Sequence, residues 1–155
     1  MNQLHVEADR TARAESGMVW GLISDAMRYP EWGPWSAAGY QRPGDASPRG
    51  AGAVYWLRSS RRAYLRYVTS VEKILEVEEG RHLAYTVIGG IPVRNYRADV
   101  TLTHADDGTH IRWAATWDDT LGGRIVQRGL RTFYPQMLAD LVAAAEEQVP
   151  VPPAG

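Results

Sequence analysis

Between residues 37 and 117 the chain consists almost entirely of strand-like segments joined by short turns. The turns are marked by Pro43-Gly44, Glu78-Glu79-Gly80, Gly89-Gly90 and Asp106-Asp107-Gly108, and the last of these is typical of a hairpin. Parallel strands need crossover connections of about a dozen residues or more, which such short turns do not provide. About six or seven strands in this arrangement therefore predict an antiparallel meander.

Before this block the pattern predicts one strand and a short helical region. Residues 3–11 alternate apolar and polar side chains, as in a strand with one wet face. Ser16 is the expected N-cap of a short helix. One further helical turn is expected over residues 26–29, before Pro30 and the glycine and proline that follow it end the helical region.

After the block, Thr120 is expected to cap one long helix that runs from about Leu121 to Gln148. Apolar residues recur in it at helical spacing, namely Ile125, Leu130, Phe133, Met137, Leu141 and Ala144 or Ala145. Pro135 lies inside this stretch. Because an interior proline removes a hydrogen bond and clashes with the preceding turn, the sequence predicts a kink or a break near residues 132–134.

The length and composition exclude several classes of protein. A chain of 155 residues suits one domain, expected over residues 1–148, with 149–155 as a disordered proline-rich tail. There is no Cys, which excludes a disulfide scaffold and a Cys-ligated zinc site. A net charge of −1 argues against a general affinity for nucleic acid or for anionic membranes. With neither a signal-peptide pattern nor a membrane-length apolar run, a cytoplasmic location without membrane insertion is expected.

A set of short motifs accompanies this order of elements: Val19-Trp20, Ser24-Asp25, Pro30-Glu31-Trp32, Gly50-Ala51-Gly52, Leu83-Ala84-Tyr85, Gly89-Gly90, Asn95-Tyr96 and Gly108-Thr109. In this order the chain resembles, over residues 3–148, the helix-grip superfamily of START lipid-transfer domains, birch-pollen-allergen-like proteins and bacterial polyketide cyclase/dehydrase-like proteins. The resemblance implies an α+β helix-grip fold. In that fold a curved antiparallel sheet of six to seven strands surrounds a long C-terminal helix, and two short helices follow the first strand. It also implies a cavity for a mostly apolar small molecule.

The stretch from Thr69 to Tyr96 also resembles the plant abscisic-acid receptor branch, in which a gate loop and a latch loop close over the ligand. That resemblance places the gate at residues 59–63 and the latch at 89–94. Ala37-Ala38 stands where those receptors carry a ligand-binding Lys, and their His-Arg-Leu latch sequence does not occur here. Abscisic acid is therefore not the expected ligand.

The strand period of two assigns side chains to the cavity once Tyr96 is taken to point inward, as the resemblance implies. For the strand at 52–58 two faces remain open, Tyr55 with Leu57 or Val54 with Trp56. The expected ligand-binding residues are Trp32, Trp35, Tyr55, Leu57, Val68, Ser70, Tyr85, Val87, Ala98, Trp113, Ala115, Trp117, Leu130, Tyr134 and Met137.

Glu72, together with Tyr96, is the candidate catalytic pair. A carboxylate on an apolar wall has its charged form disfavoured, so the pKa of Glu72 is expected to rise towards the range of a general acid or base. The alternative is that Glu72 pairs with an arginine such as Arg66, or hydrogen-bonds Tyr96, and only orients the ligand. The four His have no metal-ligand spacing, and neither a metal nor a cofactor is expected.

Three functions remain open. The preferred hypothesis is that the protein binds a flat or polycyclic, largely apolar, polyketide-like molecule and catalyses its cyclisation or dehydration. The alternatives are a non-catalytic carrier or sensor for a lipid or similar metabolite, and a protein-interaction module. Arginines near the expected mouth would attract an anionic ligand or an acyl carrier protein, or are simply solvated surface charge: Arg58, Arg61, Arg62, Arg66 and Arg94. A monomer or a homodimer is expected.

Overall fold

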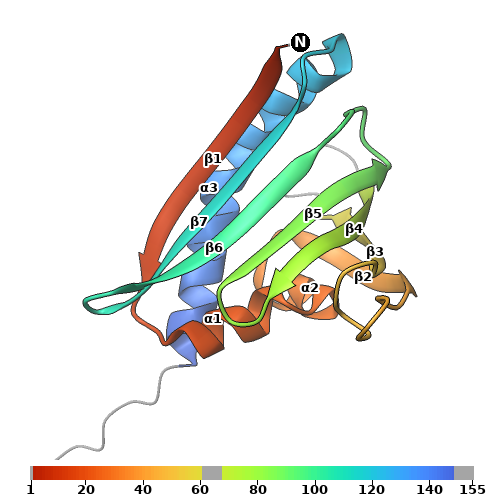
Figure 1. The fold of residues 1–155 in the computed structure, drawn as a ribbon. Coiled ribbons are helices and arrows are strands. Elements are labelled where there is room, and N and C mark those ends of the chain that lie inside the picture. Colours follow the sequence, from red (N-terminus) through yellow and green to blue (C-terminus); the bar gives the residue numbers. More distant parts are fainter. Residues whose placement is uncertain (1, 61–67, 149–155) are drawn as a thin grey trace, which may run out of the picture.

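The computed structural model describes residues 2–60 and 68–148. They form one seven-stranded sheet in the order β1-β7-β6-β5-β4-β3-β2, beside a long C-terminal helix (Figure 1). The strands are β1 (Gln3–Ala12), β2 (Trp35–Arg42), β3 (Val54–Ser59), β4 (Thr69–Glu78), β5 (His82–Gly89), β6 (Arg97–Ala105) and β7 (Gly108–Asp118). The helices are α1 (Ser16–Ile23), the 3-10 turn η1 (Ala26–Arg28), α2 (Tyr29–Trp32) and α3 (Leu121–Glu147).

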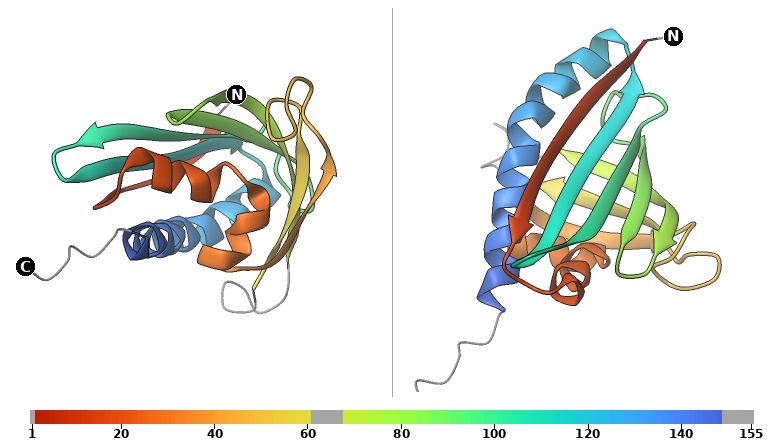
Figure 2. Two further views of the ribbon diagram at one scale, coloured as in Figure 1. Left: turned by 90° about the horizontal axis from the view of Figure 1, so that it is seen from below. Right: turned by 60° about the vertical axis from the view of Figure 1, so that its left-hand side comes forward.

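The predicted helix-grip α+β fold is confirmed. Strands β2 to β7 pair antiparallel in chain order, and β1 closes against β7. Figure 2 shows the sheet curving so that α1, α2 and α3 lie on its concave side. Residues 61–67 and 149–155 lie outside the described residues. Most of the predicted gate, at residues 59–63, and the whole predicted tail, at 149–155, therefore lie outside the part of the chain that the structure describes.

The alternation predicted for the long central strands is observed. On β6, Ala98 is buried and points to the concave side, while Asp99 is partly exposed. The register places Ala98 opposite Ala115 and Val100 opposite Trp113, so small and large side chains alternate across the inner face. Such pairing fills the core without overpacking, because a bulky ring meets a smaller neighbour.

The short helical region differs from the prediction in two details. Glu15, not Ser16, is the N-cap of α1, and its side chain makes no capping hydrogen bond. Pro30 does not end the helical region but lies in the first turn of α2, which continues to Trp32 and ends at Gly33. Proline is tolerated at that position because the first amides of a helix have no intrahelical partner.

Helix α3 begins as predicted, since the Thr120 hydroxyl accepts a hydrogen bond of 2.9 Å from the amide of Gly123. It continues as one helix through Pro135, so the predicted break is wrong. Packing on both sides of Pro135 outweighs its unfavourable helix propensity, because Tyr134, Met137, Leu138 and Leu141 are all buried. Ile125 is wrongly placed in the predicted apolar stripe, because its side chain is 65% exposed. Within the described ranges, no helix is both long and apolar enough to cross a bilayer.

Gly90 closes the end of β5 and is predicted to be intolerant of substitution. Its φ is +91°, and an added Cβ would collide with the backbone carbonyl oxygen of Thr69 on β4. We expect Gly90→Ala to lower the free energy of unfolding by about 2–3 kcal/mol in urea denaturation. Gly80→Ala is the matched control, because its φ is also positive, +78°, but the space around it is open. Equal losses in the two variants would show that the close approach to Thr69 is not the cause.

Candidate functional site

A cavity of about 80 Å³ lies between the inner face of the sheet and α3. Its wall draws side chains from strands β2, β3, β4, β5 and β7, from α2 and α3, from Val68 before β4, and from the loop that follows β5. The lining residues are Tyr29, Trp35, Leu57, Ser59, Val68, Ser70, Glu72, Tyr85, Val87, Ile91, Tyr96, Trp113, Leu130, Phe133, Tyr134 and Met137. Most of this wall is aromatic or aliphatic, so each polar group on it is distinctive.

Glu72 supplies the carboxyl group of this wall. Its side chain is buried, with 8% of the residue exposed. The hydroxyl of Tyr55 donates to its Oε1 over 2.9 Å, and the hydroxyl of Ser70 donates to its Oε2 over 2.9 Å. Burial raises the pKa of Glu72 to about 7, although both hydrogen bonds favour the charged form and lower it. Glu72 makes no ion pair with any residue that the structure describes, and Arg66 lies outside those residues.

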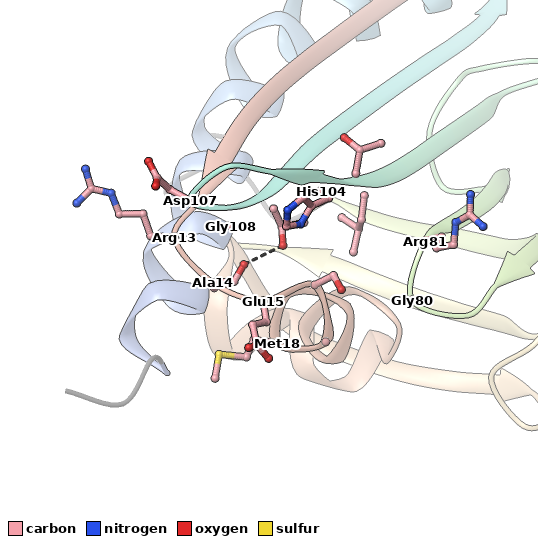
Figure 3. A pocket seen from close by; sticks show the side chains of 14 residues that line it. Arg13, Ala14, Glu15, Met18, Gly80, Arg81, His104, Asp107 and Gly108 are labelled. Atoms are coloured by element: carbon pink, nitrogen blue, oxygen red, sulfur yellow. Dashed lines mark hydrogen bonds between the residues drawn. The ribbon is translucent and has the colours of Figure 1, made fainter. Parts of the chain in front are cut away.

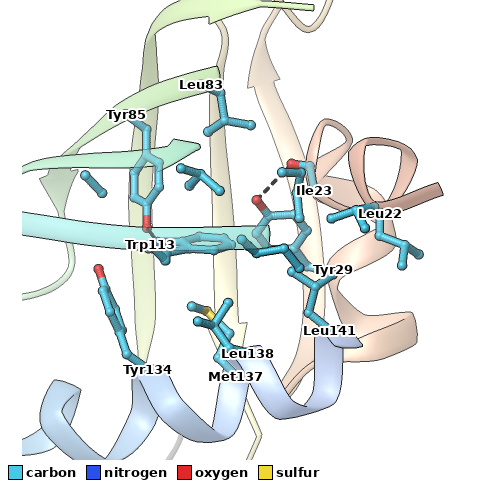
Figure 4. Packing of buried hydrophobic residues seen from close by; sticks show 14 of the residues in the cluster. Leu22, Ile23, Tyr29, Leu83, Tyr85, Trp113, Tyr134, Met137, Leu138 and Leu141 are labelled. Atoms are coloured by element: carbon cyan, nitrogen blue, oxygen red, sulfur yellow. Dashed lines mark hydrogen bonds between the residues drawn. The ribbon is translucent and has the colours of Figure 1, made fainter. Parts of the chain in front are cut away.

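A cluster of three tyrosines, Tyr85, Tyr96 and Tyr134, lines the same cavity. The hydroxyls of Tyr96 and Tyr134 share a short hydrogen bond, and the indole Nε1 of Trp113 donates to the hydroxyl of Tyr85 over 3.0 Å. Figure 4 shows the hydroxyls of Tyr85 and Tyr134 pointing toward one another beside Trp113. Burial raises the pKa of all three phenols above its usual value, which keeps them protonated at neutral pH.

The structure brings Glu72 and Tyr96 to one cavity but does not join them. The hydrogen-bond partners of Glu72 are Tyr55 and Ser70, and that of Tyr96 is Tyr134. The alternative in which Glu72 hydrogen-bonds Tyr96 directly is therefore wrong for this conformation.

The orientation of β3, which the sequence left open, is now defined. Tyr55 and Leu57 point inward, and Tyr55 lies opposite Glu72 in the register with β4. Trp56 lies on the other face, where its indole covers Gly39 of the neighbouring strand. Cross-strand pairs lie close enough for side chains to interact, which explains how the Tyr55 hydroxyl reaches the carboxyl.

The structure brings many of the predicted ligand-binding residues to the cavity wall: Trp35, Leu57, Val68, Ser70, Tyr85, Val87, Trp113, Leu130, Tyr134 and Met137. It places Tyr55 behind Glu72, and it places Trp32, Ala98, Ala115 and Trp117 in the surrounding core. The two alanines are too short to reach the cavity. Trp117 stacks under the ring of Tyr96 at 5.4 Å, and the indole of Trp32 donates to the carbonyl of Leu22.

Four lining residues were not predicted from the sequence: Tyr29, Ser59, Ile91 and Phe133. Two of them carried a usable sequence signal. Ser59 follows Leu57 at the strand period, and Phe133 lies between Leu130 and Met137 at helical spacing. Tyr29 and Ile91 lie in a short helix and in a loop, where no periodicity indicates the direction of a side chain.

Trp35 and Phe133 separate the cavity from an outer groove. Their rings meet edge to face with centroids 5.6 Å apart. Both also line a groove of about 900 Å³ between α2 and α3, which includes Trp32, Pro34, Ser60 and Pro135. Each of the two rings therefore lines both the cavity and the groove.

A second groove, of about 970 Å³, lies where the start of α1 meets the turns after β4 and β6 (Figure 3). The hydroxyl of Thr109 donates to the carbonyl of Ala14 at its base. Its ionisable side chains are all exposed, namely Arg13, Glu15, Arg81, His104 and Asp107. Exposed charges are screened by water and salt, so this groove does not provide a buried environment that would shift the pKa of a reactive group.

The surface arginines do not form one described cluster at the cavity. Arg58 donates to the hydroxyl of Ser36 over 2.9 Å, and Arg94 is exposed in the loop that supplies Ile91. Arg61, Arg62 and Arg66 lie outside the described residues. An acyl carrier protein as a partner therefore stays a prediction. Among the residues that the structure covers, no group of three His, Asp or Glu side chains is arranged to hold a metal ion.

Comparison with known proteins agrees with this geometry. Residues 3–146 match the family model described as polyketide cyclase/dehydrase and lipid transport. A START superfamily protein from Mycobacterium smegmatis has a similar structure, with a TM-score of 0.77 and 13% identity over 94% of this chain and 99% of that chain. A protein from Chromobacterium violaceum aligns with a TM-score of 0.69 and 18% identity, over 92% of this chain and 96% of its own.

Ara h 8.0201 also shares the fold, with a TM-score of 0.66 and 15% identity over 94% of this chain and 97% of that chain. At these identities the solved structures show the fold alone. No curated protein matches the sequence. The family model, in contrast, spans nearly the whole chain. The chain therefore belongs to the polyketide cyclase/dehydrase and lipid transport family of the helix-grip superfamily.

Proposed function

We propose that this protein binds a compact, mostly apolar molecule with one polar oxygen group, and that Glu72 exchanges a proton with this molecule. The observation that carries the proposal is the buried Glu72 carboxyl on the wall of an otherwise largely apolar cavity. Small-molecule sites typically combine an apolar lining with a few convergent polar groups. The family to which the chain belongs supports a hydrophobic ligand.

The size of the cavity restricts the ligand. Typical ligand sites measure about 300–1,000 Å³, and a cavity of about 150 Å³ is known to hold benzene. The cavity here is about 80 Å³. A one-ring ligand therefore requires a small displacement of the wall, and a polycyclic ligand, as expected from the sequence, requires a much larger one. Movement of Trp35 or Phe133 would add volume, because both side chains also line the groove of about 900 Å³.

Catalysis of a cyclisation or dehydration is the preferred form of this function. With a pKa of about 7, Glu72 is present in both protonation states near neutral pH, as a general acid or base requires. The largely apolar wall would also displace water around a bound ligand and hold the ligand in a reactive conformer.

A non-catalytic carrier or sensor is the second candidate. It is favoured by the fact that Glu72 already accepts hydrogen bonds from Tyr55 and Ser70, a fixed arrangement that suits holding a ligand. Turnover distinguishes the two candidates. A bound ligand that is recovered unchanged after long incubation indicates a carrier.

Phe133→Ala is expected to widen the range of ligands by joining the cavity to the outer groove. In a thermal-shift screen we expect the wild type to be stabilised by one-ring ketones and phenols, but little by two-ring analogues. The variant should bind two-ring compounds at least tenfold more tightly than the wild type does. Leu121→Ala is the control, since Leu121 lies on the same helix but is 80% exposed. If wild type and Phe133→Ala show the same size limit, Phe133 does not separate the cavity from the groove.

A further inference from the structure

The tyrosine cluster defined above places three hydrogen-bond donors together on the cavity wall. Tyr85, Tyr96 and Tyr134 are 6%, 4% and 2% exposed, and each phenol carries one O–H donor. The bond between Tyr96 and Tyr134 consumes one of their two hydrogens. The oxygen of Tyr85 accepts from Trp113, which leaves its own hydrogen to be placed. The hydroxyl of Tyr85 also interacts with those of Tyr96 and Tyr134, so the three phenols lie close enough to donate to one another or to one oxygen atom in the cavity.

Glu72, in contrast, has room to accept further hydrogen bonds. Each carboxylate oxygen can accept more than one hydrogen bond, and Tyr55 and Ser70 supply one donor to each. The carboxyl and the three phenols line the same cavity of about 80 Å³, roughly the volume of two to three water molecules at about 30 Å³ each. A molecule that fills so small a space touches both groups at once.

We propose that the tyrosine cluster is an oxygen-binding subsite for a carbonyl group, and that Glu72 exchanges a proton with the carbon next to that carbonyl. The substrate class is then an enolisable ketone or aldehyde no larger than about one ring. This inference rests on the proposed function, because it places the proposed ligand in the same cavity and assigns its polar group to the tyrosines.

The proposed step balances without a further reactant. The Glu72 carboxylate takes a proton from the α-carbon, and the C–H electron pair forms a carbon–carbon double bond. The carbonyl π pair moves to the oxygen, which accepts hydrogen bonds from the tyrosine cluster. Glu72 then returns the proton to the same carbon, or to the far end of a conjugated system, which gives an isomer. Preorganised donors in a site that excludes water stabilise such a developing oxyanion strongly.

The phenols suit this role because they remain neutral donors. Burial raises the pKa of Tyr96 and Tyr134 above its usual value. Neither tyrosine therefore adds a negative charge next to the oxyanion at neutral pH. Tyr96 is also held in place by Trp117, whose ring stacks on it at 5.4 Å.

The test follows acetone and cyclopentanone, labelled with carbon-13 at the carbonyl, at millimolar concentration in D2O with the full-length protein. Because the Glu72 carboxyl proton exchanges with D2O between removal and return, we expect exchange of the α-hydrogens for deuterium to run about 100-fold faster than in buffer. Glu72→Gln should return the rate to that of buffer, and Tyr134→Phe should lower it at least tenfold. Tyr40→Phe is the matched control, since the Tyr40 hydroxyl bonds Asp25 and the amide of Ala26 instead of lining the cavity.

The carbonyl carbon-13 shift separates binding from chemistry. We expect it to move downfield in the wild type and in Glu72→Gln, and to stay at its value in buffer in the double variant Tyr96→Phe/Tyr134→Phe. A ketone that binds with an unshifted carbonyl and no exchange would overturn this inference and leave the proposed binding function intact. Exchange that persists in Glu72→Gln would overturn the role of Glu72. Failure of any small apolar molecule to bind would instead count against the proposed function itself.

Discussion

Glu72→Gln is expected to stabilise the protein at pH 8 by about 3 kcal/mol. Burial raises the pKa of Glu72 from 4.5 to about 7, so at pH 8 the folded protein holds an unfavourably buried charge that the unfolded chain exposes to water. Glutamine removes this charge and keeps both hydrogen bonds. Its carbonyl accepts from Tyr55, and its amide donates to the hydroxyl of Ser70. For a domain of this size the melting temperature should rise by about 6–12 °C.

The same substitution should flatten the dependence of stability on pH. Between pH 4.5 and about 7 the folded protein binds more protons at Glu72 than the unfolded chain does. Since stability falls with rising pH wherever the folded state binds more protons, the wild type loses the stabilisation as pH rises through this window. The tyrosines that face Glu72 remain neutral there, because burial raises the pKa of Tyr55 and Tyr85 as well.

Urea denaturation at pH 5 and at pH 8 measures this effect directly. The wild type and Glu72→Gln should be similar at pH 5 and should differ by about 3 kcal/mol at pH 8. Glu78→Gln is the control, because Glu78 is exposed and pairs with Arg81, so its effect should stay within about 0.5 kcal/mol. A Glu72→Gln variant that is less stable than the wild type at pH 8 would contradict the claim that a buried charge on Glu72 destabilises the folded protein.

Trp117→Ala is expected to destabilise the protein by about 3–5 kcal/mol. Trp117 is fully buried, its indole donates to the carbonyl of Gly123 over 3.0 Å, and its ring supports Tyr96. Alanine leaves a large cavity and removes the indole hydrogen bond to a carbonyl in the first turn of α3. The loss should appear in urea denaturation, together with weaker binding of any ligand that contacts Tyr96.

Trp56→Ala is the matched control for this loss. Trp56 lies on the outer face of the sheet, partly exposed, where its ring covers Gly39. Its removal uncovers surface but opens no interior space, so the expected loss is less than half of that for Trp117→Ala. Equal losses of stability in the two variants would mean that the packing of the buried Trp117 ring is not the cause of the loss in Trp117→Ala.

The fold was predictable because it follows from local pattern. Alternation on β6 and β7 indicated which residues face the core, and Thr120 marked the start of α3. The continuity of α3 through Pro135 was not predictable, since it depends on packing against the sheet. The inward direction of Tyr55 depends on the register of β3 with β4, which no local signal specifies when both faces of a strand are apolar.

The residue types of the candidate site were predictable, but not its connections. Glu72 and Tyr96 were identified from strand parity and from the family resemblance. The partners of their polar groups come from other strands and from α3, as in the contact of Tyr96 with Tyr134. The volume of the cavity is equally non-local, since it is set by how the rings of Trp35 and Phe133 meet. Side-chain packing between distant segments decides both properties.

The most direct test of the account is native mass spectrometry of freshly purified protein, followed by addition of a library of one-ring ketones and phenols. We predict a co-purifying or added compound at a ratio of one to one. The cavity-filling variant Val87→Phe should lose that compound while keeping its fold, because Val87 lines the cavity. If no compound binds the wild type or raises its melting temperature, or if Val87→Phe binds as tightly as the wild type, the proposal that this cavity holds a small molecule is wrong.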